Sequence, residues 1–327
     1  MSAEGGTKAV MAALLANTGI AITKFIAFAL TGASSMLAEG IHSVADSGNQ
    51  VLLLVGGKRA ARAATPQHPF GYGRDRYIYS FLVAIVLFSV GGLFALYEAY
   101  HKWHEVHAHE PNELLEGKWW WVAVVVLLVA IVMETFSFRT AINESNKVRG
   151  KTGWAEFIRR AKSPELPVIL LEDFAALIGL MLALLGVSLS KLTGNGYFDV
   201  AGTAGIGLLL VSVAAVLGVE TKSLLLGEAA TPEAQRRLKE RLEHTQGIDR
   251  VIHMRTMHLG PDELLVGVKV GVSRESDAAS VAACIDAAER AMRDAEPTAR
   301  VIYVEPDIYV EGHQPEVRRE PPTTVGH

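Results

Sequence analysis

Two residue types that bind divalent cations lie four positions apart in the segment LAEGIHSVADSGNQ, as His42 and Asp46. Four residues make slightly more than one helical turn, so the imidazole and the carboxylate lie one above the other on one face. The surrounding stretch, 35–55, is apolar enough to cross a bilayer, where ionisable groups usually mark an ion or proton path. The pair is predicted to be half of a metal site; the alternative is a hydrogen-bonding role toward neighbouring helices.

One imidazole and one carboxylate leave a tetrahedral zinc ion two ligands short, so a second half-site is required. It is predicted in the apolar stretch 166–192, which carries the adjacent acidic residues Glu172 and Asp173. Neighbouring helical residues point about 100° apart. One carboxylate is therefore expected to face the metal, while the other faces a neighbouring helix or receives a proton. The alternative is that both are satisfied by hydrogen bonds between helices.

Weaker candidates flank the first pair. Glu39 lies about one turn before His42, as either an outer ligand or an interfacial residue. Asn49 lies three residues after Asp46 and is expected to orient that carboxylate. The histidine-rich segment 101–110, HKWHEVHAHE, is interpreted as a solvated loop with an aromatic anchor, although such tracts also gather zinc.

The composition limits the possible classes of protein. The chain has 327 residues, of which 50% are hydrophobic, a mean hydropathy of +0.25 and a net charge of −4. These values predict several membrane spans with a soluble part, and they give no support for nucleic-acid binding. A single cysteine, Cys284, excludes an intrachain disulfide and a cysteine-rich metal cluster. No nucleophile and base stand at a workable spacing, so neither an enzyme nor an enzyme cofactor is expected.

Six apolar stretches approach the length needed to cross a hydrocarbon core of about 30 Å. They cover 9–30, 35–55, 78–100, 119–142, 166–192 and 201–219. Basic residues gather in the loops after the second and fourth stretches, whereas the loop after the third is acidic. The positive-inside rule therefore places both termini in the cytoplasm. We expect a multi-pass integral protein of a bacterial plasma membrane, with a transport domain at 1–225.

The composition becomes that of a soluble domain after this region. Thr231 and Pro232 form a helix start, which is followed by strands at 251–257 and 263–272, a helix at 278–295 and a strand at 299–304. This order predicts a small cytoplasmic α+β domain of the ferredoxin-like kind at 226–311. The polar, proline-containing tail at 312–327 is expected to be disordered.

Over residues 8–311 these features resemble the cation diffusion facilitators, a family of divalent-metal/proton antiporters. The likeness rests on the HxxxD pair and on the segment HPFGYGRDR at 68–76. The motifs EGIHSVADSGNQ, LLEDFAA and EPDIY look most similar to the branch that contains the animal mitochondrial zinc exporter. The resemblance implies a homodimer in the lipid bilayer, which exports zinc or a similar divalent cation from the cytoplasm in exchange for protons.

The resemblance also assigns ligands. It implies metal binding by His42, Asp46 and Asp173, with Glu172 as a helper. Better-known members carry a further ligand four residues before the fifth-span aspartate, where this chain has Ile169. Either Glu172 or water is expected to complete the shell. The missing ligand keeps a second interpretation open, in which the chain is a metal-binding regulator or partner subunit with a degenerate, non-transporting site.

Overall fold

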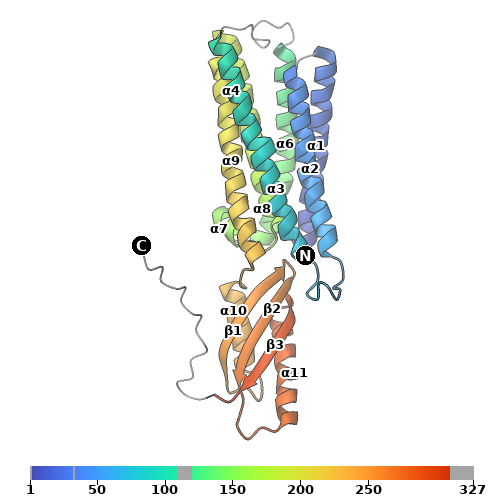
Figure 1. Cartoon of the computed structure of the whole chain (residues 1–327), viewed down its shortest axis with the longest axis vertical. Coiled ribbons are helices and arrows are strands. Elements are labelled where there is room, and N and C mark those ends of the chain that lie inside the picture. The colour runs from blue at the N-terminus through green and yellow to red at the C-terminus, as the bar shows by residue number, and fades with distance from the viewer. Residues whose placement is uncertain (1, 32–33, 109–119, 310–327) are drawn as a thin grey trace, which may run out of the picture. The chain divides into compact units, whose positions relative to one another are not determined.

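The computed structural model describes residues 2–31, 34–108 and 120–309, with the side chains of all of these except 2–5, 31, 34–39 and 41. The chain divides into two compact units, Met1–Leu226 and Gly227–His327. The first unit is helical, and the second combines helices with a sheet (Figure 1). The tail predicted to be disordered, 312–327, lies outside the described residues.

Long helical rods build the first unit (Figure 1). One rod is composite, because α3, η1 and α4 follow one another without a break. A short helix, α7, lies in the connection between α6 and α8. The elements are α1 (Ser2–Thr31), α2 (Ser34–Ala60), α3 (Asp75–Val86), η1 (Leu87–Leu93), α4 (Phe94–His107), α6 (Trp120–Arg149), α7 (Trp154–Arg160), α8 (Glu165–Thr193) and α9 (Tyr197–Leu226).

Among the described residues, five helices are long and apolar enough to cross a membrane. They are Gly6–Leu30, Asp75–His107, Trp120–Arg149, Glu165–Thr193 and Tyr197–Leu226. Helix α2 is long but carries polar residues through its middle, including His42, Asp46 and Asn49. The five apolar helices therefore support a membrane domain. The predicted count of six spans is reached only if α2 also crosses the membrane.

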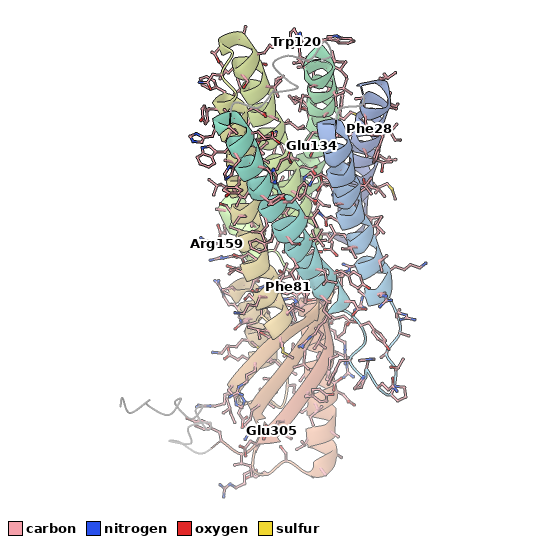
Figure 2. All side chains as sticks on the ribbon, turned by 45° about the horizontal axis from the view of Figure 1, so that its top comes forward. Phe28, Phe81, Trp120, Glu134, Arg159 and Glu305 are labelled. Atoms are coloured by element: carbon pink, nitrogen blue, oxygen red, sulfur yellow. The ribbon has the colours of Figure 1, made fainter. Side chains whose placement is uncertain are left out.

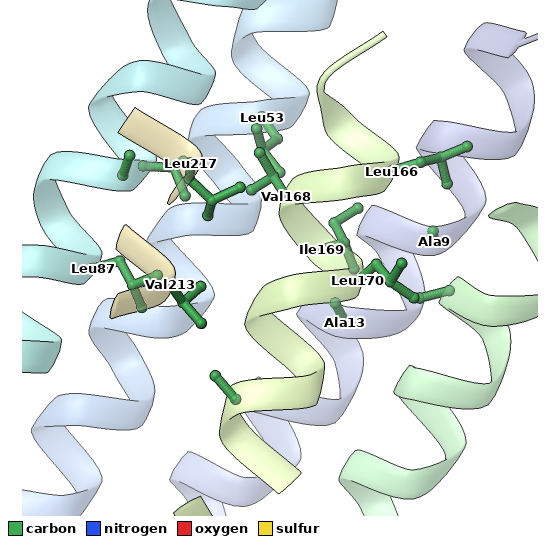
Figure 3. Close-up of a cluster of buried hydrophobic side chains, with 14 of the residues drawn as sticks. Ala9, Ala13, Leu53, Leu87, Leu166, Val168, Ile169, Leu170, Val213 and Leu217 are labelled. Carbon is green, nitrogen blue, oxygen red and sulfur yellow. The ribbon is translucent and has the colours of Figure 1, made fainter. Parts of the chain in front are cut away.

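The rods pack side by side as a closed ring. Helix α1 contacts α2 and α6, α6 contacts α8, and α8 contacts α9. The composite rod closes the ring, because α3 packs on both α2 and α9. A buried apolar cluster from all six of these rods, part of which is drawn in Figure 3, includes Ala13, Leu53, Leu87, Ala141, Ile169, Leu170, Val213 and Leu217. This packing holds the polar stretch of α2 inside the ring.

The composite rod passes through a π-helical segment, η1, which contains the buried glycines Gly91 and Gly92. A Cβ atom on Gly92 would lie 2.7 Å from Cγ2 of Val211 and 3.1 Å from its backbone nitrogen. Only glycine lets η1 approach α9 this closely. Wide π-helical turns within α-helices occur frequently at functional sites.

The second unit has the predicted order of helix, two strands, helix and strand. Its elements are α10 (Pro232–Glu243), β1 (Arg250–Gly260), β2 (Glu263–Gly271), α11 (Ala278–Ala295) and β3 (Ala299–Asp307). The sheet order is β1-β2-β3, in which β1 and β2 are antiparallel and β2 and β3 are parallel. The second unit is thus a three-stranded α+β unit. Strand β1 extends beyond its predicted range at both ends, and β3 does so at its C-terminal end.

One face of this sheet forms the core of the second unit. Alternate residues of β2 are buried, and they share a cluster with apolar side chains of α10 and α11. The cluster includes Leu238, Leu242, Leu264, Val266, Val268, Val270, Cys284, Ala288 and Met292. Cys284 is free and buried, as expected for a small apolar residue of a helix. Thr231 caps α10 by accepting a hydrogen bond from the backbone nitrogen of Ala234, with proline at the first helical position.

Candidate metal-transport site

A cavity of about 170 Å³ lies inside the ring of helices. This volume accommodates several water molecules, because one water needs about 10–15 Å³ of such a cavity. All the rods of the ring contribute to its lining. The polar residues that line it are Asn17, Lys24, His42, Ser43, Asp46, Glu98, Lys102, Glu134, Glu172, Asp199 and Thr203.

His42 and Asp46 both line this cavity from α2. Nε2 of His42 lies 3.7 Å from Oδ2 of Asp46, as the four-residue spacing requires. Each side chain is about a quarter exposed, because it faces the cavity. Gly91 of η1 lies next to the imidazole, since a Cβ atom there would lie 3.8 Å from Cε1 of His42, an ordinary contact distance. The pair is therefore accessible to an ion inside the bundle.

Glu172 lines the same cavity from α8. Its carboxylate accepts hydrogen bonds from Nδ2 of Asn49 at 2.9 Å and from Nε2 of Gln50 at 3.1 Å. Nδ2 of Asn17 donates in turn to Oε1 of Gln50, at 3.3 Å. The expectation that Asn49 orients Asp46 is wrong, because its amide donates to the carboxylate on α8.

Asp173 points to a different helix. Its carboxylate is 1% exposed and accepts a hydrogen bond of 2.7 Å from Oγ of Ser137 in α6. Asp173 is not among the described residues that line the cavity, whereas its neighbour Glu172 is. The 100° between adjacent helical positions separates the two carboxylates in this way. The side chain of Glu39, the remaining candidate, lies outside the described part of the chain.

Two further ionisable residues line the cavity and were not among the candidates taken from the sequence. Glu134 of α6 is 2% exposed, and Figure 2 shows it inside the helical part of the molecule. Lys24 of α1 is also buried, and its Nζ donates a hydrogen bond of 3.0 Å to Oγ of Ser43. The signal that identifies both is an ionisable residue within an apolar run. Neither has a metal-binding residue type four positions away, as His42 has in Asp46.

A second polar group lines the cavity farther along the composite rod. Nζ of Lys102 lies 3.0 Å from Oδ2 of Asp199 and 3.6 Å from Oε1 of Glu98, and it donates to Oγ1 of Thr203 at 3.3 Å. This cluster joins α4 to α9. It begins about two helical turns beyond Gly91, so it is separate from the His42 pair.

The histidines of α4 lie on an exposed, aromatic surface. The ring of His107 stacks on Trp103 with 5.4 Å between centroids, and Nε2 of His104 lies 3.0 Å from the hydroxyl of Tyr100. The predicted loop is wrong for this part of the segment, which is helical to His107, whereas the contacts agree with an aromatic anchor near a membrane surface. The last two residues of the predicted segment, His109 and Glu110, lie outside the described residues.

The candidate ligands line one cavity without converging on one point. Within the ranges that the structure describes, no group of three His, Cys, Asp or Glu side chains is close enough to hold a metal ion. The arrangement can attract a cation, because carboxylates outnumber ammonium groups around His42. A contraction of the cavity is needed to bring the donors to coordination distances of about 2.0–2.2 Å.

Known proteins match both the helical unit and most of the chain. A family profile described as the cation efflux transmembrane domain matches residues 10–226. The mouse (Mus musculus) protein named proton-coupled zinc antiporter SLC30A9, mitochondrial, is 32% identical over 260 residues, which cover 79% of this chain and 44% of that protein. The chain therefore matches less than half of that relative's length.

More distant relatives cover a similar part of the chain. Metal tolerance protein C4 of Arabidopsis thaliana is 28% identical over 257 residues, which cover 78% of this chain and 54% of that protein. Magnetosome protein MamM of Paramagnetospirillum magneticum is 23% identical over 258 residues, with coverages of 78% and 74%.

Proposed function

Because the chain belongs to the cation efflux family, whose members are transporters and not enzymes, we propose that it exports zinc or a similar divalent cation from the cytoplasm in exchange for protons. The observation that carries the proposal is the placement of His42, Asp46 and Glu172 around one cavity inside the helical ring. Imidazole and carboxylate donors suit zinc, which takes nitrogen and oxygen ligands in four-coordinate sites. The name of the mouse relative, a proton-coupled zinc antiporter, supports the same choice of ion.

The exchange follows from the chemistry of these donors. A carboxylate or an imidazole must be deprotonated to bind a metal, so metal entry releases protons and proton entry releases metal. The cavity then presents its ligands to one side of the membrane at a time. Rocking of α1, α2, α6 and α8 against the other rods is the proposed alternation, because α2 and α8 carry the candidate ligands, α1 contacts both of them, and α6 contacts α1 and α8.

We assign the ligand on α8 to Glu172 in preference to Asp173. Glu172 lines the cavity and is oriented by Asn49 and Gln50 of the same helix that carries the first pair. Asp173 holds α8 against α6 through Ser137 and is proposed to support the site from behind. A carboxylate thus takes the place of the ligand that Ile169 does not provide.

The proposed topology has six spans, with α2 as the sixth, and both termini in the cytoplasm. Basic residues at the ends of α2 and α6, such as Lys58, Arg59, Lys147 and Arg149, support this orientation through the positive-inside rule. We also propose a homodimer, in which the second unit serves as a ferredoxin-like dimerisation domain. The relatives include proteins named as mitochondrial and as magnetosomal, so a bacterial plasma membrane stays an expectation.

Downhill zinc flux into proteoliposomes tests the proposal. The wild-type protein should carry zinc, and Asp46→Asn should reduce the flux at least tenfold while the protein still folds and inserts. A regulator with a degenerate site would bind zinc without carrying it. Binding with no flux above protein-free vesicles would therefore favour the regulator and contradict a transporter.

A further inference from the structure

Glu134 is a carboxylate in the interior of the helical unit, on α6. It is 2% exposed, and it lines the cavity that His42, Asp46 and Glu172 also line. Within the described part of the chain, no hydrogen-bond donor and no ion-pair partner contacts its carboxylate. A buried carboxylate in this situation is strongly unfavourable, and in a membrane span it usually marks a functional site.

Other buried carboxylates of the helical unit have the hydrogen-bond or ion-pair partners that Glu134 lacks among the described residues. Glu172 accepts hydrogen bonds from Asn49 and Gln50, and Asp173 accepts one from Ser137. Glu144, on the same helix as Glu134, pairs with Lys147. Each of these acids has a protein partner that stabilises it. Glu134 instead lines the cavity, which has room for a bound ion.

The charges around Glu134 favour a cation as that partner. The groups near enough to act on its carboxylate are Asp46 of α2, Glu172 and Asp173 of α8, and Lys24 of α1. Of these, Asp46, Glu172 and Lys24 line the cavity together with Glu134. Once the three carboxylates Asp46, Glu134 and Glu172 are deprotonated, as metal binding requires, they and the ammonium group of Lys24 carry an excess of two negative charges. That excess matches one divalent cation.

We propose that Glu134 is the fourth protein ligand of the transported cation, supplied by α6. The inference rests on the proposed function and adds a residue to its site. With His42, Asp46 and Glu172 it makes a set of one nitrogen and three oxygen donors from three helices. Four such donors complete the shell of a four-coordinate ion. A set so rich in carboxylate also favours harder cations such as Mn²⁺ more than a histidine-rich site does. Binding draws α6 toward α2 and α8, because the four donors do not converge in this conformation.

Zinc titration of the purified full-length protein, with a competing metal indicator, tests the proposal. Glu134→Gln keeps the volume of the side chain and removes its charge. It should weaken zinc binding by at least about 10- to 100-fold, which is the usual effect of losing a residue that only supports a metal ligand. Glu134→Asp keeps the charge and should bind with intermediate affinity. Glu144→Gln, the matched change on the same helix but outside the cavity, should bind zinc as the wild type does.

Thermal unfolding of the metal-free protein separates a ligand from a structural residue. Since Glu134 has no hydrogen-bond or ion-pair partner among the described residues, Glu134→Gln should unfold at the same or a higher temperature than the wild type, and its stabilisation by zinc should shrink. A lower unfolding temperature without metal would overturn the proposal. Wild-type zinc affinity in Glu134→Gln, with affinity lost in Asp46→Asn, would overturn it while leaving the proposed function intact. Zinc binding by the wild-type protein with no flux above protein-free vesicles would instead reject the proposed function itself.

Discussion

The amide of Asn49 donates a hydrogen bond of 2.9 Å to the carboxylate of Glu172, and this contact joins α2 to α8 beside the cavity. Both side chains are buried. The second oxygen of the Glu172 carboxylate accepts from Gln50 of the same helix. The acid that we assign to the metal is thus held in place by the helix that carries His42 and Asp46.

Asn49→Ala should destabilise the protein by about 1–3 kcal/mol, because it leaves a buried carboxylate short of one donor. It should also weaken zinc binding, since Glu172 is less well oriented. Denaturation of the purified protein and zinc titration measure the two effects. Asn146→Ala, an exposed asparagine of α6, serves as the control and should change stability by less than about 0.5 kcal/mol. Equal stability of the two variants would contradict the role of Asn49.

Glu172→Gln should reduce zinc affinity and flux far more than Asp173→Asn. Glu172 lines the cavity, whereas Asp173 is bonded to Ser137 of α6. Asp173→Asn should instead lower stability with only a small effect on affinity. Paired titrations and flux assays on the two variants measure the difference. The reverse order would place Asp173 at the metal and show that α8 is rotated by one residue in the transporting state.

Gly92→Ala should destabilise the helical unit by about 1–3 kcal/mol, because the new methyl group overlaps Val211 of α9. Gly218→Ala is the matched control on α9, since a Cβ atom there has nothing within 4 Å. It should stabilise by about 0.5–1 kcal/mol, the usual gain for alanine over glycine inside a helix. Unfolding temperatures of the two variants would be compared with the wild type. If both moved in the same direction, close packing of η1 on α9 would be refuted.

The second unit should lose stability in acid partly through Asp277. The backbone N–H of Ser280 donates to the Asp277 carboxylate at 2.8 Å at the start of α11, and this hydrogen bond holds the pKa of Asp277 below its ordinary value. A lowered pKa in the folded state contributes stability above the unfolded pKa of about 3.9, and that contribution disappears as pH falls through the folded pKa.

Asp277→Asn keeps a capping side chain that does not titrate in this range. In a domain comprising residues 227–309, the variant should therefore gain stability relative to the wild type as pH falls below about 4. Urea unfolding at a series of pH values measures the difference. Parallel pH profiles for the two proteins would show that the cap contributes nothing to acid unfolding.

The helices and strands were predicted closely from the sequence, because long apolar runs favour membrane-spanning helices and alternating apolar residues favour strands. The resemblance to the cation diffusion facilitators is confirmed by the family match. The helices extend beyond the apolar runs, as α6 does to Arg149, since polar ends remain helical outside a hydrocarbon core. The His42 and Asp46 pair was visible because spacing along one helix decides which residues share a face.

The remaining part of the site depends on helix rotation, which the sequence does not contain. Adjacent residues such as Glu172 and Asp173 differ by about 100°, and only packing of α8 against α2 and α6 decides which faces the cavity. The partner of Asn49 is Glu172 of another helix, and this contact also depends on how α2 and α8 are rotated. Glu134 was missed because no second metal-binding residue type lies four positions away, although a carboxylate within an apolar run is itself a signal.

Zinc accumulation driven by a pH gradient tests the central claim most directly. Proteoliposomes with a clamped membrane potential would contain the wild-type protein or Asp46→Asn, with zinc at equal concentrations on both sides. The account predicts that the wild type concentrates zinc on the acidic side only while the gradient lasts, and that Asp46→Asn does not. Zinc that stays at equal concentrations despite the gradient, in vesicles shown to carry zinc downhill, would contradict proton exchange.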